Sequence, residues 1–208
     1  GSGNVATYAI EKALSLGGKV VTASDSSGFV YDPDGIDVET LKQIKEVRRA
    51  RISEYAKERP NAKFYEGKKV WGVPCDIALP CATQNELDGE DAKQLIANGV
   101  KVVAEVSNMG CRPEAIDAFI AAKIPYGPGK AVNAGGVATS GLEMTQNCMH
   151  LSWSGKEVDE KLHFIMESIH EACVKYGRQD DGHIDYVKGA NIAGFMKVAH
   201  AMLEQGII

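Results

Sequence analysis

The sequence lacks a long apolar run and an excess of positive charge. None of the apolar stretches in its 208 residues approaches the roughly 20 consecutive residues that a transmembrane helix needs, so we expect no membrane-spanning segment. The formal net charge is −5, and the one basic stretch, residues 45–51, is short. Because phosphate neutralisation requires clustered Lys and Arg side chains, we also expect no nucleic acid partner.

Paired cysteines and metal-ligand clusters are absent as well. There are five cysteines, an odd number with no C-x-x-C pair, at positions 75, 81, 111, 148 and 173. They lie within apolar segments, which favours reduced thiols in a cytoplasmic protein over a disulfide framework. His163 and His170 could share a helix face, but no third ligand follows at metal spacing, so no metal site is expected.

What is present is an ordinary globular composition, 44% apolar and 25% charged, arranged in alternating helical and strand-like segments. Apolar residues at helical spacing predict a helix over residues 5–14, and Asp37, Asp88 and Pro113 each suit the start of another. The helix after Asp37 is expected to run to about residue 58. Short apolar runs predict strands at 19–23, 69–73, 77–79, 101–106 and 124–126, and residues 28–35 are expected to be a turn-rich insert.

This alternation predicts an α/β fold, a Rossmann-like and mostly parallel sheet flanked by helices. After residue 129 the pattern changes to three helical stretches, 134–149, 157–176 and 187–203, with no strand between them. We therefore predict a dinucleotide-binding domain over residues 1–150 and a C-terminal helical segment over residues 151–208. These last helices either cover the sheet or pack on a domain outside this chain.

The sequence opens with a glycine-rich turn directly ahead of a helix, in the pattern G-x-G-x-x-A. Gly1 allows the tight turn, Gly3 lets a pyrophosphate approach the backbone, and Ala6 keeps the helix close to its neighbouring strand. The N–H groups of Asn4 and Val5 lie at the positive end of the helix dipole, where phosphates are favoured. Such a turn normally follows a strand, so we expect one immediately ahead of Gly1.

Asp25 lies 22 positions after Gly3, close to the roughly 20 expected for an acidic residue that faces the adenosine ribose. An acid alone would favour NAD. Ser26 follows at once, however, and Lys45 comes from the next helix, and hydroxyls with a basic side chain suit a 2′-phosphate. We predict NADP as the cofactor, with NAD possible. The alternative is that Ser26 belongs to a turn and the basic residues form a solvated face.

Two longer segments resemble glutamate dehydrogenases of the hexameric type. They are residues 75–87, CDIALPCATQNEL, and residues 128–144, PGKAVNAGGVATSGLEM. With the glycine turn and residues 24–28 they extend the resemblance over the whole chain, in the same order. One departure is Val-Ser-Asn-Met-Gly at residues 106–110, where many members of that family have Gly-Ala-Asn-Met-Pro.

The resemblance implies roles for individual residues. Asn4 is similar to the family's asparagine at the cofactor, and Ala82, Thr83 and Gln84 to the loop that flanks the riboses. Asn108 and Asn133 match asparagines that line the nicotinamide pocket. Val137 and Ser140 match residues at the far end of the substrate, where Ser140 would donate to the side-chain carboxylate of L-glutamate. Without the resemblance, a buried structural role for Ser140 would be preferred.

The resemblance also implies reversible oxidative deamination of L-glutamate to 2-oxoglutarate and ammonia by a homo-hexamer. The catalytic lysine and proton carrier of that family come from an amino-terminal domain, and we identify no catalytic residue in this sequence. We therefore expect this chain alone to be inactive. The alternatives are a leucine, valine or phenylalanine dehydrogenase, and a non-catalytic dinucleotide-binding module.

Overall fold

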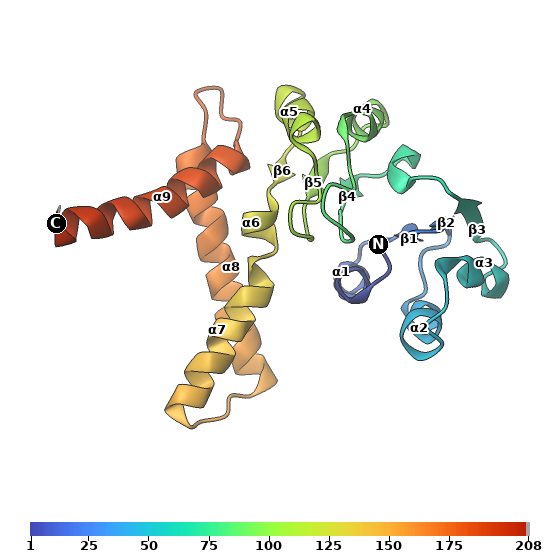
Figure 1. The fold of residues 1–208 in the computed structure, drawn as a ribbon, viewed down its shortest axis with the longest axis horizontal. Coiled ribbons are helices and arrows are strands. Elements are labelled where there is room, and N and C mark those ends of the chain that lie inside the picture. Colours follow the sequence, from blue (N-terminus) through green and yellow to red (C-terminus); the bar gives the residue numbers. More distant parts are fainter. Residues whose placement is uncertain (207–208) are drawn as a thin grey trace.

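The computed structural model describes residues 1–206, which form an α/β body and a helical arm (Figure 1). In the body, β1 (Thr22–Asp25), β2 (Gly28–Tyr31) and β3 (Lys63–Glu66) form one antiparallel sheet. A second sheet, formed by β4 (Ile77–Ala78), β5 (Val102–Ala104) and β6 (Tyr126–Gly127), is parallel. The α/β class with a parallel sheet and flanking helices is confirmed.

Three of the body's helices begin where the sequence predicts. The Asp37 carboxylate accepts from Thr40 N at 2.8 Å and caps α2 (Val38–Lys42). Asp88 caps α4 (Gly89–Ala97) in a reciprocal capping box with Asp91. Pro113 occupies the first turn of α5 (Pro113–Ala121), where its missing N–H costs nothing.

Two apolar clusters form the core of the body, one for each sheet. The first lies under the antiparallel sheet and includes the fully buried Val30, Leu41 and Tyr55. The second packs α4 and α5 against the parallel sheet through Val103, Phe119 and their neighbours. In this second cluster the ring of Phe119 stacks on that of Tyr126 with centroids 5.8 Å apart. Each sheet therefore has its own core.

Several predicted elements of the N-terminal half are wrong in detail. Strand β2 lies within the expected turn-rich insert 28–35, and strand β3 was not predicted. The expected strand 69–73 contains a 3-10 helix, η3 (Val70–Gly72), and the strand predicted over 19–23 begins only at Thr22.

The single helix expected from Asp37 to about residue 58 is broken into four pieces. After α2 come a π-helical turn, η1 (Gln43–Val47), a 3-10 turn, η2 (Ile52–Glu54), and α3 (Tyr55–Glu58). Between η1 and η2 the backbone of Arg49 is left-handed, with φ 51°. The N–H of Ile52 then donates to Asp25 on β1, a tertiary contact that the helical pattern does not reveal.

Strands β1 and β4 are the end strands of their sheets, and a cleft of about 470 Å³ lies between them. Helix α1 (Asn4–Ser15) contributes Ile10 to its wall, Ala23 and Ala78 line it from the two sheets, and Trp71 lines it from η3. We call this cleft the inter-sheet slot. Gly1 also lines it.

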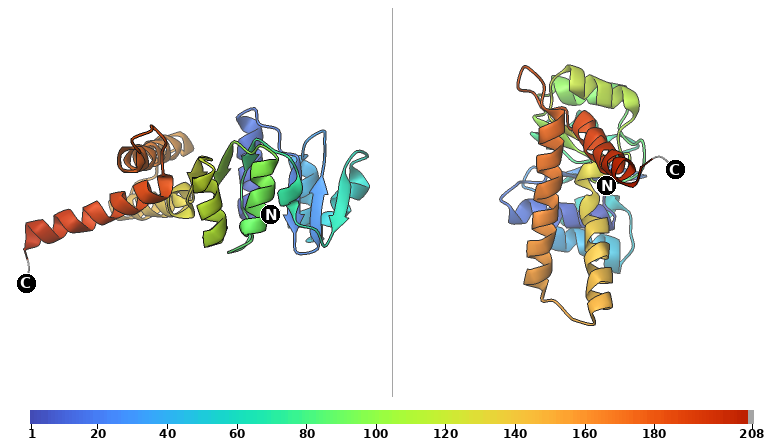
Figure 2. Two further views of the ribbon diagram at one scale, coloured as in Figure 1. Left: turned by 90° about the horizontal axis from the view of Figure 1, so that it is seen from above. Right: turned by 90° about the vertical axis from the view of Figure 1, so that its left-hand side faces the viewer.

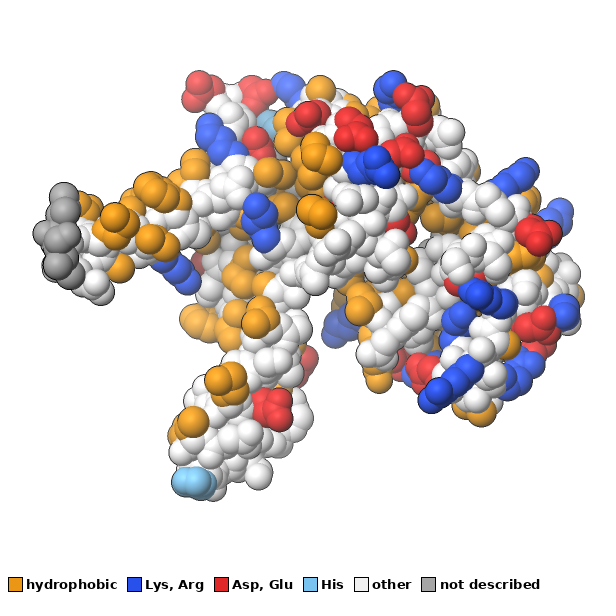
Figure 3. Space-filling model, in the orientation of Figure 1, with side chains coloured by type: hydrophobic (Ala, Val, Ile, Leu, Met, Phe, Trp, Pro, Cys, Tyr) orange, Lys and Arg blue, Asp and Glu red, His pale blue; other side chains and the backbone are white. Residues whose placement is uncertain are grey.

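The arm begins after β6 with α6 (Gly129–Val132) and α7 (Ala134–Met149), and continues with α8 (Gly155–Gly177) and α9 (Tyr186–Gln205). The three predicted helices are confirmed. Helices α8 and α9 pack as a hairpin, and the far half of α9 projects away from the body (Figures 1 and 2). Figure 3 shows apolar side chains along this projection, where Phe195 is 65% and Leu203 80% exposed. Across residues 1–206, no helix has the length and apolarity needed to cross a membrane.

Candidate functional site

The glycine turn leads directly into α1, whose N-cap is Gly3. No side chain among the described residues caps this helix end, so its first N–H groups point away from the helix without a side-chain acceptor. A phosphate is the kind of group that such an end binds, because it accepts hydrogen bonds and complements the positive end of the helix dipole.

The two glycines of the turn meet very different surroundings. A Cβ on Gly1 would lie 3.0 Å from the Cys81 carbonyl oxygen and 3.2 Å from the Ala82 Cβ, so Gly1 allows the loop after β4 to pack against the turn. A Cβ on Gly3 would have no heavy atom within 4 Å. Since no neighbour among residues 1–206 requires a glycine at this position, the open space at Gly3 fits a ligand that approaches the backbone.

A cleft of about 660 Å³, which we call the glycine-turn cleft, opens in front of the N-terminus of α1. One wall comes from the glycine turn, the end of β1 and η1. The other comes from the loops after β3 and β4, including Trp71 and Glu86. The predicted cofactor residues that line it are Gly1, Gly3, Asn4, Val5, Asp25, Ser26, Lys45, Ala82 and Thr83.

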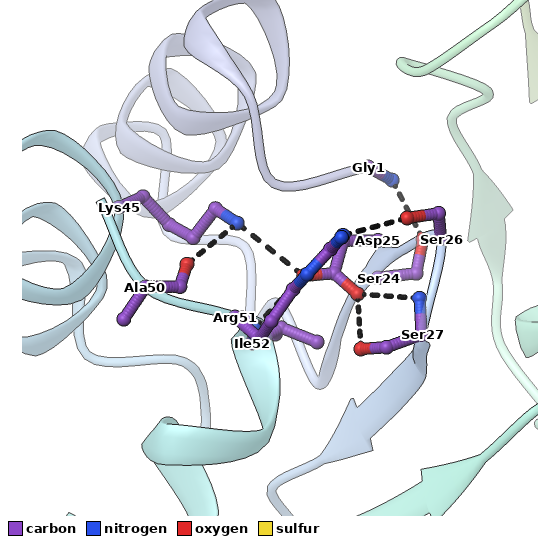
Figure 4. A network of polar contacts seen from close by, with 9 residues as sticks. All are labelled: Gly1, Ser24, Asp25, Ser26, Ser27, Lys45, Ala50, Arg51 and Ile52. Carbon is purple, nitrogen blue, oxygen red and sulfur yellow. Dashed lines mark hydrogen bonds and ion pairs between the residues drawn. The ribbon is translucent and has the colours of Figure 1, made fainter.

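Asp25, the last residue of β1, is the centre of a polar network shown in Figure 4. Its Oδ1 accepts from the backbone N and the Oγ of Ser27, at 2.8 and 2.5 Å. Its Oδ2 accepts from Ile52 N at 2.9 Å and from Lys45 Nζ at 3.3 Å. Both carboxylate oxygens are thus engaged by two donors each from within the protein.

This network changes the acidity of Asp25. Burial alone would raise the pKa of its carboxyl, but the hydrogen bonds from Ser27, Ile52 and Lys45 outweigh burial and lower the pKa to about 2. The carboxylate therefore stays ionised and holds the β1 turn, η1 and η2 together.

The basic side chains of residues 45–51 divide between the cleft and the surface. Lys45 lines the cleft and donates to Asp25 and, at 3.1 Å, to the Ala50 carbonyl oxygen. Arg51 donates from Nη1 to Ser26 Oγ at 2.7 Å, at the rim of the cleft (Figure 4). Arg48 pairs instead with Glu58, away from the cleft.

A second cleft of about 670 Å³ adjoins the first and shares Val5, Cys81 and Ala82 with it. We call it the asparagine cleft, because Asn108 and Asn133 line it together with Gln84. Figure 3 shows the hollow between the body and the arm into which it opens. The two clefts together run from Ser26 at one end to Val137, on α7, at the other.

Backbone hydrogen bonds hold the two loops of the asparagine cleft against each other. Asn85 N donates to the Met109 carbonyl oxygen at 2.8 Å, and Ser107 N donates to that of Pro80 at 3.0 Å. Asn133, at the end of α6, donates from its side-chain amide to Asn108 Oδ1. The two predicted asparagines are therefore in direct contact, although they lie 25 positions apart.

The two predicted substrate residues lie one turn apart on α7 but differ in position. Val137 is 73% exposed and lines the asparagine cleft. Ser140 is exposed, does not line either cleft, and its Oγ donates to the Gly136 carbonyl oxygen at 3.3 Å. The alternative, that Ser140 is buried and has a structural role, is wrong within residues 1–206, because its side chain is exposed.

The structure thus assembles every predicted cofactor residue around the two adjoining clefts, and leaves Ser140 outside them. Sequence reasoning missed Arg51, which differs from its basic neighbours only through its tertiary contact with Ser26. It also missed Glu105, a buried carboxylate next to the asparagine cleft. Among the described residues, no group of three or more His, Cys, Asp or Glu side chains could hold a metal ion.

A glycine turn that opens a helix beside the end strand of an α/β sheet defines the class of Rossmann-type α/β domains. The model of the Glutamate/Leucine/Phenylalanine/Valine dehydrogenase family matches residues 1–206. The chain belongs to this family.

Individual relatives are similar over the whole chain. It is 64% identical over 211 residues to the NAD-specific glutamate dehydrogenase of Bacteroides fragilis, and 59% identical over 211 residues to the NADP-specific glutamate dehydrogenase of Haemophilus influenzae. Each match covers 100% of this chain and 47% of the relative. The chain therefore spans about half the length of the curated relatives it matches.

Solved structures give the same result. Plasmodium falciparum glutamate dehydrogenase superposes with a TM-score of 0.93 at 47% identity, over 100% of this chain and 45% of that one. A hetero-hexameric glutamate dehydrogenase from Thermus thermophilus gives a TM-score of 0.79 at 26% identity, over 99% of this chain and 46% of that one.

Proposed function

We propose that this chain is the cofactor-binding part of a glutamate dehydrogenase, which converts L-glutamate to 2-oxoglutarate and ammonia with NADP as the hydride acceptor. The observation that carries this proposal is the convergence of all twelve predicted cofactor residues on two adjoining clefts. Residues 1–150 would hold the dinucleotide, and residues 151–208 would pack back on a domain outside this chain.

The dimensions and donors of the clefts fit a dinucleotide. The pyrophosphate would lie at the N-terminus of α1, where Gly3 leaves space for it. The adenosine end would lie at Ser26, and the nicotinamide end at Asn108 and Asn133. The bound nicotinamide supplies the hydride chemistry, while the protein positions the ring and excludes water from it.

The donors around Ser26 favour NADP over NAD. Because Asp25 already accepts four hydrogen bonds, it has little capacity left for the ribose 2′-hydroxyl that it would recognise in an NAD enzyme. Arg51 donates to the Ser26 hydroxyl, and Lys45 lines the same cleft next to Asp25, so two basic side chains and a hydroxyl are available to a 2′-phosphate. Relatives are named for both cofactors, so the choice depends on these contacts.

A comparison of NADPH and NADH affinities tests this choice. Ser26→Ala combined with Lys45→Ala should weaken NADPH by roughly tenfold to a hundredfold for each lost charge-assisted contact, and NADH much less. Arg48→Ala, which removes a nearby arginine that pairs with Glu58, is the control and should leave both affinities unchanged. Equal losses of the two cofactors in the double variant would show that these residues do not bind the 2′-phosphate.

Glutamate as the substrate depends on two residues in the first half of α7, Val137 and Ser140. In the complete enzyme, Ser140 would donate to the side-chain carboxylate of glutamate, with Val137 beside it. Ser140→Ala should then raise KM for glutamate and 2-oxoglutarate by about tenfold or more and leave KM for the cofactor unchanged. In this structure Ser140 lies outside both clefts. Unchanged kinetics would show that Ser140 does not bind the carboxylate and would favour a leucine, valine or phenylalanine dehydrogenase of the same family.

Activity would require groups that these 208 residues do not supply. Lysines and acids line the glycine-turn cleft, among them Lys68, Lys69 and Glu86. We assign the catalytic lysine and proton carrier to a domain outside this chain instead, and we expect the isolated chain to bind dinucleotide without turnover. We further propose that the complete enzyme is a cytoplasmic homo-hexamer. Turnover by the isolated chain would contradict the first expectation, and a monomeric complete enzyme would contradict the second.

A further inference from the structure

Glu105 is a buried carboxylate that the proposed function leaves without a role. It follows β5 directly and is 4% exposed. Its Oε1 accepts from Cys111 N at 2.6 Å, and its Oε2 accepts from Gly129 N at 2.7 Å. One side chain therefore joins two separate segments, the loop after β5 and the start of α6.

These two segments pack with backbone in contact with backbone. A Cβ on Gly129 would lie 2.9 Å from the Ser107 carbonyl oxygen and 3.1 Å from Glu105 Oε2. Neither segment can shift toward the other without a clash. The contacts that join them include the hydrogen bond between Asn133 and Asn108 at the cleft, and the buried Glu105 carboxylate, which accepts from both backbones.

Each segment carries one asparagine of the asparagine cleft. Asn108 lies in the loop between Glu105 and Cys111, and Asn133 ends the short helix that begins at Gly129. We propose that Glu105 is a positioning residue, which sets Asn108 and Asn133 in register for the nicotinamide end of the dinucleotide. This inference rests on the proposed function and assigns a role to a residue that would not touch the ligand.

The arrangement requires a carboxylate rather than an amide. Both partners are N–H donors, so both side-chain oxygens must accept. In Glu105→Gln the amide nitrogen would face one of these N–H groups, donor against donor, and that segment would be released. Burial first, and then the nearby Glu105 carboxylate, raise the pKa of the Cys111 thiol, which stays protonated.

The test compares two ligands that differ only in the nicotinamide. Titration of the complete protein with NADPH and with 2′-phospho-ADP-ribose reports the whole dinucleotide site and its adenosine half separately. Glu105→Gln should weaken NADPH by about tenfold or more and change 2′-phospho-ADP-ribose less than about twofold. It should also reduce the change in NADPH fluorescence that accompanies binding of the nicotinamide ring.

Two further variants separate positioning from a general loss of folding. Asp32→Asn alters another buried carboxylate, which accepts from Tyr55 on the far side of the antiparallel sheet, and should weaken neither ligand selectively. Gly129→Ala keeps Glu105 but pushes α6 away from Ser107, and should reproduce the selective loss of NADPH even if Glu105→Gln does not fold.

The outcomes distinguish the two proposals. Equal weakening of both ligands by Glu105→Gln and Gly129→Ala, or no weakening of either ligand, would overturn the role of Glu105 while the dinucleotide site stands. A wild-type protein that binds neither ligand would overturn both proposals.

Discussion

Gly3 is a residue at which ligand binding and stability are separable. Its φ of −84° is open to any residue, and a Cβ there would meet no protein atom within 4 Å. Gly3→Ala should therefore change the free energy of unfolding by less than about 0.5 kcal/mol. It should nevertheless weaken NADPH about tenfold or more, because the methyl group occupies the space through which a pyrophosphate approaches the backbone.

Isothermal titration and urea denaturation of Gly3→Ala measure the two effects. Gly1→Ala is the matched comparison: its Cβ would lie 3.0 Å from the Cys81 carbonyl oxygen, so it should lower stability as well as affinity. An unchanged NADPH affinity in Gly3→Ala would remove the glycine turn from the proposed site.

The Asp25 network predicts a dependence of stability on pH. The folded pKa of about 2 lies below the unfolded value of 3.8, so the carboxylate contributes its full stabilisation above about pH 4 and loses it as the pH falls toward 2. A difference of this size corresponds to about 2 kcal/mol. Asp25→Asn should therefore be less stable than the wild type by about this amount at pH 7, and the gap should narrow below pH 4.

Urea denaturation between pH 7 and pH 2.5 checks this prediction. Asp76→Asn is the control, since Asp76 forms an exposed pair with Lys101 and such pairs contribute little. A gap between Asp25→Asn and the wild type that stays constant down to pH 2.5 would contradict the lowered pKa.

At the scale of residues, local sequence patterns were sufficient to identify part of the candidate site. The glycine turn and Asp25 are recognisable because their spacing alone defines them, and the structure places both at the cleft. Arg51 and Glu105 are not recognisable in this way. Arg51 matters through a contact 25 positions away, and Glu105 through contacts made by a backbone that only the folded chain brings near it.

At the scale of elements, helices with strong end signals were predicted well. Asp37, Asp88 and Pro113 fix the starts of α2, α4 and α5 through local chemistry. Strands β2 and β3 and the π-helical turn η1 were missed. Their conformations depend on cross-strand pairing and on the contact between Asp25 and Ile52, which no local pattern encodes.

The α8–α9 hairpin provides a prediction about one element. A Cβ on Gly189 would lie 2.1 Å from the Cys173 carbonyl oxygen of α8, whereas a Cβ on Gly194 would meet nothing within 4 Å. Gly189→Ala should destabilise the protein by about 2 kcal/mol or more, because the two helices must separate. Gly194→Ala, on the same helix, should stabilise it by up to about 1 kcal/mol through helix propensity.

Thermal denaturation of the two variants gives the answer. The same substitution in the same helix is expected to have opposite signs, so general effects of alanine cancel. Similar melting temperatures for Gly189→Ala and Gly194→Ala would show that the close contact between α8 and α9 does not hold the hairpin.

At the scale of the whole molecule, the inter-sheet slot separates two sheets that each end in an unshared strand edge. The slot is lined by apolar side chains, including Ile10 and Trp71, on both sides. A short apolar, β-branched segment added ahead of Gly1 should enter it and pair with β1 and β4. A gain of about 2 kcal/mol would raise the melting temperature by about 4–8 °C in a chain of this size.

An extension of equal length made of Gly and Ser is the control, and should leave the melting temperature unchanged. Amide hydrogen exchange at Thr22 and Ile77 reports the pairing itself, since both residues line the slot and their N–H groups lie on the strand edges away from β2 and β5. If the apolar extension slows exchange no more than the control does, the slot does not accept a strand.

The glycine-turn cleft has walls from both sides of that slot: Ser24 and Lys45 belong to the half with the antiparallel sheet, and Trp71 and Ala82 to the segments that lead into and out of β4. A dinucleotide bound there would contact both halves at once and stabilise their relative position. At a hundredfold excess over Kd it would add about 2.7 kcal/mol to the folded state by mass action. The dinucleotide would then protect the chain from proteases, and depletion of the cellular dinucleotide pool would shorten the lifetime of the chain.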